Sequence, residues 1–195
     1  MTKRPRRNHS PEFKAKVALA AIRGEFCLER SDGSKLTNKD YQLGTPAQID
    51  TGTRITTGEG ARVQFLLPDE TVFTVGANSD VVLDEFVYDP DLSPRKILLS
   101  VTKGIFRWVT GKVVHKDPAL MKVKLPVGTI GIRGTDFEVT LSPDGSGSIV
   151  LHSGQLEITK NKTGSQFLME AGETVTIGAD GDISRPEKLG GASGF

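Results

Sequence analysis

The chain has little cysteine and no long apolar run, and both absences exclude classes of protein. Cys27 is its only cysteine, which rules out an intrachain disulfide and leaves the redox compartment undetermined. No apolar run approaches the ~20 residues of a membrane-spanning helix. The run VALAAI between Lys16 and Arg23 is shorter than the ~7–15 apolar residues of a secretion signal. We therefore expect no membrane span and no signal peptide, so that the chain as written would stay in the cytoplasm.

Aromatic residues are also scarce, whereas glycine is plentiful. Phe, Trp and Tyr make up 6% of the chain, and 22 of its 195 residues are glycine. This balance favours many short strands and tight turns over long packed helices. The length fits one ordinary domain with a tail, or two small domains.

The formal net charge is only +1, but the charge is unevenly spread. Residues 1–24 contain seven basic residues and one acidic residue, so this segment carries +6 and the rest of the chain −5. A basic head on a mildly acidic body indicates that only the head could contact nucleic acid. The candidates for weak, nonspecific contact with phosphates are Lys3, Arg4, Arg6 and Arg7.

The head carries the signals of a helix. Ser10 suits an N-cap and Pro11 the first helical position. Glu12 places a negative charge in the first turn, and Gly24 supplies a C-cap. These signals predict a helix over residues 11–23.

The stretch RNHSPEFKAKVALAAIRGE resembles the first helix of the small helix-turn-helix subunit of insertion-sequence transposases. The resemblance covers residues 1–25, and the following FCLERSDGSKLTNKDYQ shows no second helical period. A helix-turn-helix reads bases with its second helix, which is missing. We expect a fusion remnant, an isolated arm whose removal leaves thermal stability unchanged. A DNA-binding transposition accessory and a fusion product without a selected role stay open as alternatives.

From residue 41 onward the apolar residues alternate with polar ones, as half-buried strands require. The alternating runs are ARVQFLL, MKVKL, FEVTL, LEITK and TVTIG. Turn-forming residues separate them at spacings of about 8–12 residues, which favours a sandwich or roll. The prediction is an all-β fold, a compact stacked roll or sandwich of short strands, preceded by the single N-terminal helix.

The strand-rich part resembles the FecR domain, a family of regulatory domains. The motifs that carry the resemblance occur in order over residues 41–183: TRITTGEGARVQFLLPDETVFTVGANSDVVLDEFVYDP, SVTKGIFRWVTGKV, VKLPVGTIGIRGTDFEV, LHSGQLEI and MEAGETVTI. The resemblance implies a non-enzymatic module for sensing or protein interaction, of the periplasmic, signal-transducing type. It also implies a protein or envelope component as the partner, and no cofactor.

The predicted organisation follows from these two resemblances. Residues 1–25 form the basic arm and helix, 26–40 a linker, 41–185 the FecR-like domain and 186–195 a disordered tail. Within the domain, ten residues carry the family motifs, and we expect structural roles for them: Asp69, Glu70, Thr71, Gly104, Phe106, Gly128, Gly131, Arg133, Gly134 and Thr135.

GTIGIRGTD invites interpretation as a phosphate-binding loop, but an alternating strand follows it where a helix is needed. Its glycines instead predict bends or close backbone approach between packed strands. Arg133 is expected to pair with Asp136 or Asp84, with anion binding as the less favoured role.

No catalytic or metal-binding pattern stands out. The histidines His9, His115 and His152 lie in three separate segments, without partners at zinc-like spacing. The acidic LDEFVYDPD could offer oxygens to calcium, but it matches no EF-hand. We predict no metal site and no enzyme.

Two further segments give structural expectations. IFRWVTG places Phe106 and Trp108 on one face of a strand and Ile105 and Val109 on the other, which predicts a central strand buried on both faces. The lysines of MKVK are expected on the outer face of an edge strand, where lysine discourages aggregation.

Overall fold

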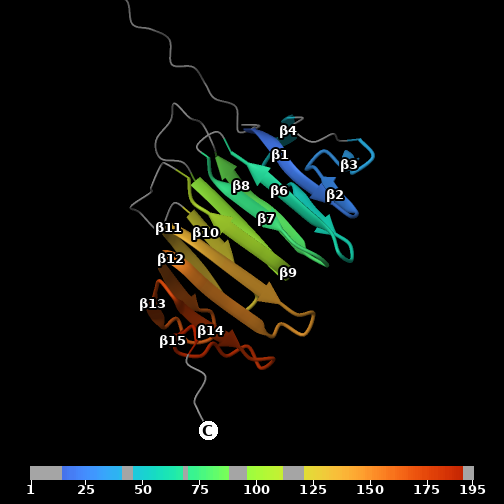
Figure 1. The fold of residues 1–195 in the computed structure, drawn as a ribbon. Helices are drawn as coiled ribbons and strands as arrows, with labels where there is room; N and C mark the ends of the chain where they lie inside the picture. Colours follow the sequence, from blue (N-terminus) through green and yellow to red (C-terminus); the bar gives the residue numbers. More distant parts are fainter. Residues whose placement is uncertain (1–14, 41–45, 68–69, 88–95, 112–120, 191–195) are drawn as a thin grey trace, which may run out of the picture.

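The computed structural model describes residues 15–40, 46–67, 70–87, 96–111 and 121–190 (Figure 1). These ranges contain fifteen β-strands joined by hydrogen bonds into one sheet, and no helix. The all-β prediction is therefore confirmed for the described part of the chain. Within the same ranges, no helix is long and apolar enough to cross a membrane.

Three strands of 14 residues each, β9 (Lys96–Val109), β11 (Gly128–Leu141) and β12 (Gly147–Lys160), run through the middle of the molecule. The two halves of each strand have different neighbours, so the long strands belong to two half-sheets at once. Gly104, Gly134 and Gly154 lie where the neighbours change, with φ of 98°, 66° and 84°. Glycine adopts this left-handed backbone without steric cost, so these positions let the strands bend from one half-sheet into the other.

The first half-sheet surrounds the C-terminal halves of β9 and β11 and the N-terminal half of β12. Its order from one edge is β4, β1, β6, β7, β9, β11, β12, β14 and β15. The bounds are β4 Pro46–Ile49, β1 Ala15–Arg23, β6 Arg62–Leu66, β7 Val72–Val75, β14 Glu173–Ile177 and β15 Glu187–Lys188.

The second half-sheet surrounds the opposite halves of the long strands. Its order is β3, β2, β5, β8, β9, β10, β11, β12 and β13. The bounds are β3 Lys35–Thr37, β2 Phe26–Glu29, β5 Arg54–Thr57, β8 Asp80–Val87, β10 Met121–Lys124 and β13 Gln166–Glu170. The strand β10 runs parallel to β9 and antiparallel to β11. Its lysines therefore lie on an internal strand, and the expected edge position is wrong.

One hydrophobic core includes buried residues from both half-sheets. A row of buried aromatic rings crosses β6, β7 and β9: Phe65 stacks on Phe73 with ring centroids 4.5 Å apart, and Phe73 stacks on Trp108 at 5.8 Å. Phe106 is tilted against Trp108 and against Phe137 of β11. Each large aromatic side chain removes a large apolar area from water, so this row contributes strongly to the core-facing side of the first half-sheet.

The prediction of an N-terminal helix is wrong for residues 15–23, which form β1 between β4 and β6. Residues 11–14 lie outside the described part. Isolated helices shorter than ~12–15 residues are marginal in water. The open edge of β6 offers this segment a ladder of backbone hydrogen bonds instead. The strand pairing therefore outweighs the local helix propensity of this segment. Gly24, expected as a helix C-cap, forms the turn from β1 to β2 with φ of 72°.

Other boundaries also change. The expected linker, residues 26–40, contains β2 and β3, and its Phe26 and Leu28 belong to the core. The expected disordered tail begins with β15, which pairs with β14, while residues 191–195 lie outside the described part.

Candidate functional site

The motif residues that were expected to be structural can be placed one by one. In the turn from β6 to β7, Glu70 is exposed with φ of 67°. The neighbouring Thr71 is buried, and its hydroxyl accepts a hydrogen bond of 3.0 Å from the Gly111 N–H. This bond ties the turn to the end of β9. Asp69 lies outside the described residues.

The glycines of the motifs lie at close approaches between backbones. A Cβ on Gly104 would come 2.1 Å from the Ser79 Oγ, and one on Gly128 would come 2.7 Å from the Thr159 carbonyl oxygen. Gly131 pairs with β10 on one side and β12 on the other. Close packing of strands explains these positions without a bound phosphate.

The remaining motif residues belong to the same bends and core. Phe106 and Thr135 are buried, and the Thr135 N–H donates a hydrogen bond of 3.0 Å to Thr110 Oγ1. Arg133 pairs with Glu157, with 3.2 Å between Nη2 and Oε2. The expected pairing of Arg133 with Asp136 or Asp84 is wrong, because Asp136 is held by Arg107.

The described residues contain no group of three or more His, Cys, Asp and Glu side chains able to hold a metal ion. In the acidic stretch, Asp84 accepts a hydrogen bond from Ser100, and Glu85 pairs with Lys96 at 2.8 Å. His152 is exposed. The other members of the acidic stretch and of the histidine set, Asp89, Asp91, His9 and His115, lie outside the described part, as do Lys3, Arg4, Arg6 and Arg7.

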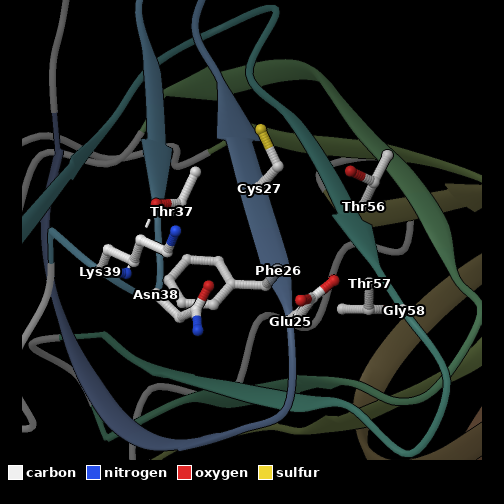
Figure 2. Close-up of a pocket in the computed structure, with 9 residues that line it drawn as sticks. All are labelled: Glu25, Phe26, Cys27, Thr37, Asn38, Lys39, Thr56, Thr57 and Gly58. Carbon is white, nitrogen blue, oxygen red and sulfur yellow. Dashed lines mark hydrogen bonds between the residues drawn. The ribbon is translucent and has the colours of Figure 1, made fainter.

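A first shallow hollow of about 470 Å³ lies over β2, β3 and β5 (Figure 2). Figure 2 shows the Phe26 ring beside Asn38 and Lys39, and the Cys27 side chain between Thr37 and Thr56. The lining mixes one acidic and one basic side chain with hydroxyl and amide groups. This hollow is wide and carries no concentrated charge, so it presents no defined chemistry.

A second groove of about 350 Å³ lies on the outer face of the first half-sheet. Three arginines line it: Arg23 of β1, Arg62 of β6 and Arg107 of β9. Ile105 forms an apolar part of its wall and is 39% exposed. We call it the arginine groove. The expectation that both faces of this segment of β9 are buried is thus wrong, because Phe106 and Trp108 face the core and Ile105 faces the groove.

Arg107 differs from the other two arginines because it has an acidic partner. Its Nε and Nη2 donate hydrogen bonds of 3.0 and 2.8 Å to the two carboxylate oxygens of Asp136. These bonds raise the pKa of Arg107 above its ordinary value. Glu138 is the register partner of Arg107 on β11 and also lines the groove. The positive charge that no carboxylate of the described residues neutralises therefore lies at the β1–β6 end of the arginine groove, at Arg23 and Arg62.

A third hollow of about 290 Å³ lies on the second half-sheet and is lined by lysines of β9 and β10. Lys96 is already paired with Glu85, which leaves Lys122 and Lys124 as its basic side chains.

Sequence reasoning missed the arginine groove. Arg62 alternates outward in ARVQF, but a single outward arginine on a strand is ordinary. Arg23 was assigned to a helix, so its position opposite Arg62 depends on a strand pairing that local signals did not indicate.

Comparison with known proteins supports the fold and the family. Among curated proteins no match is found. Two crystal structures of a candidate anti-sigma factor from Parabacteroides distasonis, at 1.65 and 2.50 Å resolution, have a similar fold, each with a TM-score of 0.53 and 17% sequence identity. The similar region covers 69% of this chain and 59% of that one, so the chain spans a little over half of the length of its structural neighbour. The family model of the FecR protein matches residues 53–157, more than half of the chain, and the chain therefore belongs to the FecR family.

Proposed function

We propose that this chain is a non-enzymatic sensing and protein-interaction module of bacterial signalling, which works by recognising a partner protein on an outer face of its sheet. The observation that carries the proposal is the FecR match over residues 53–157. The fold shared with a candidate anti-sigma factor supports the same regulatory class.

The surface of the described part fits recognition better than catalysis. The three hollows described above are open to solvent. Several described motif residues, among them Thr71, Gly104, Phe106 and Thr135, lie in a turn, at a bend or in the core. An interaction module needs such a rigid scaffold with exposed faces, because preorganised surfaces lose less conformational freedom on binding.

Site-specific photo-crosslinking in the bacterium that makes the chain tests this proposal. A photoreactive phenylalanine analogue would replace Leu66, which is 37% exposed on β6 of the first half-sheet, or Leu168, which is 49% exposed on β13 of the second. We expect a reproducible adduct with a defined protein from one of the two positions, identified by mass spectrometry. Absence of a protein adduct from both positions, in cells where the chain is folded, would contradict the proposal.

A further inference from the structure

Two arginines face each other across strands at the edge of the arginine groove. Arg23 of β1 is the direct register partner of Arg62 of β6, and opposed residues of antiparallel strands have Cβ atoms about 4.5–5.5 Å apart. Both side chains are exposed. Like charges placed directly opposite each other destabilise a strand pair, so this arrangement needs a compensating reason.

Neither arginine has an acidic partner among the described residues. In the same part of the chain Arg54, Arg107 and Arg133 each pair with a carboxylate, at 2.5, 2.8 and 3.2 Å. The donors of Arg23 and Arg62 are therefore not used by any carboxylate of the described residues, and planar guanidinium groups are suited to binding a carboxylate with two parallel hydrogen bonds.

The groove continues from this pair as a row across the sheet. The strand registers place Arg62, Gly76 and Ile105 in line, and the Gly76 N–H donates a 2.7 Å hydrogen bond to the Ile105 carbonyl. A Cβ on Gly76 would come 2.8 Å from the Ile105 Cβ. The missing side chain at Gly76 thus leaves the flank of Ile105 open.

This row combines a basic end with an apolar floor at a fixed separation. Ile105 lies two strands from Arg62, and neighbouring strands are about 4.8 Å apart, so the two features are roughly 10 Å apart. An extended peptide rises about 3.3 Å per residue. Two positions in such a peptide span about 6.6 Å and keep both side chains on the same face, so an acidic and an apolar residue at this spacing would meet the two features once the long arginine side chains reach toward the carboxylate.

We propose that the arginine groove binds an extended acidic–apolar segment of the partner protein. An Asp or Glu carboxylate of that segment bridges Arg23 and Arg62, and an apolar side chain two residues away packs on Ile105 above Gly76. This inference rests on the proposed function and specifies its binding face. Charge complementarity sets the orientation, because Glu138 repels acidic groups from the opposite end of the groove.

The test uses the full chain and fluorescein-labelled octapeptides of Gly and Ser that carry one Glu and one Leu, two positions apart. Binding is followed by fluorescence anisotropy at several salt concentrations. We expect binding that weakens when Glu is replaced by Gln or Leu by Ser, and that falls as salt rises. Arg23→Gln and Arg62→Gln should each weaken it about 10-fold, a typical loss for a hydrogen bond to a charged group.

Matched variants separate binding from folding. Arg185→Gln makes the same charge change at an exposed position outside the groove lining and should leave peptide binding unchanged. Ile105→Ser should weaken binding of the Leu peptide, whereas Leu66→Ser, a similarly exposed residue outside the groove lining, should not. Because Arg23 and Arg62 repel each other, Arg23→Gln and Arg62→Gln should keep or raise the Tm.

Several results would overturn the inference. One is binding of inorganic phosphate or duplex DNA through the same two arginines, with no effect of the Leu, which would define a general anion site. Another is self-association of the chain that Arg62→Gln abolishes, which would make a second copy the occupant. If the Leu66 or Leu168 crosslink forms in Arg62→Gln with the same yield as in the parent chain, the groove is wrong while the proposed function stands. If no crosslink forms in either background, the proposed function itself fails.

Discussion

Gly154 of β12 lies directly against Gly134 of β11: a Cβ on Gly154 would come 2.2 Å from the Gly134 carbonyl oxygen. Both residues have positive φ, 84° and 66°. The bend in β12 therefore requires glycine at position 154, because any side chain there would collide with the backbone of β11. Gly134 lies in the motif GIRGTD, so this pair gives that part of the family motif a geometric meaning.

We predict that Gly134→Val destabilises the protein several times more than Lys122→Ala. A β-branched residue at a φ of 66° costs about 1–3 kcal/mol in backbone strain. Lys122 is a partly exposed surface residue, where substitution usually changes stability by less than about 0.5 kcal/mol. Urea unfolding of both variants checks this, and equal midpoints would show that the bend is not constrained.

A second prediction concerns β1. Deletion of residues 1–23 should lower stability by about 3–5 kcal/mol, at about 1 kcal/mol for each ladder hydrogen bond lost. The deletion would also remove the contact of Ile22 with the core and expose the edge of β6 to solvent. Deletion of residues 1–14, which keeps β1, is the matched control and should have a much smaller effect. Thermal melts that coincide for both deletions and the full chain would restore the separate-arm interpretation.

The two-residue period of the sequence was enough to predict the strands and the all-β class. In β11, Phe137, Val139 and Leu141 are buried as FEVTL predicts. Alternation reports which face of a strand is buried, and that property is local. The prediction for the N-terminal segment failed because AKVALAAIR also fits a helix. Only the unpaired edge of β6 decides between helix and strand.

The candidate site was less accessible from sequence for a related reason. Arg23 and Arg62 are 39 positions apart in the chain, and their opposition depends on the β1–β6 register. Ion-pair partners show the same limit: Arg133 reaches Glu157 on the neighbouring strand rather than Asp136, three positions further along its own strand. Sequence spacing cannot choose among partners that only the register brings together.

A third prediction concerns Ser79, which joins the turn after β7 to the bend in β9. Its hydroxyl lies 2.9 Å from the Gly76 carbonyl, to which it donates, and accepts a 2.9 Å hydrogen bond from the Ile105 N–H. Ser79→Ala would leave that N–H without this partner, which typically costs about 1–3 kcal/mol when the group is buried. Ser79→Thr keeps the hydroxyl but adds a methyl group beside Gly104. Urea unfolding should place Ser79→Ala well below the parent chain, and an unchanged midpoint would mean that water replaces the hydroxyl.

The last prediction is a pH dependence from the ion pair between β5 and β8. Arg54 donates two hydrogen bonds to Asp80, at 2.8 and 2.5 Å, and these bonds lower the pKa of Asp80 below its ordinary value. A carboxyl whose pKa is depressed in the folded state stabilises the protein above its unfolded pKa, and that stability is lost as pH falls through the folded pKa.

Arg54→Gln should therefore destabilise the protein at pH 7 by about 0.5–1 kcal/mol, the range of a largely exposed pair. The difference from the parent chain should shrink below about pH 4, the ordinary pKa of aspartate, as protonation removes the same interaction from the parent. Arg185→Gln, which breaks no ion pair between described residues, controls for the change in net charge. Urea titrations of the three proteins at pH 7 and pH 3 measure the effect. A difference between Arg54→Gln and the parent that stays constant across this range would show that Arg54 acts through packing of its aliphatic stem rather than through Asp80.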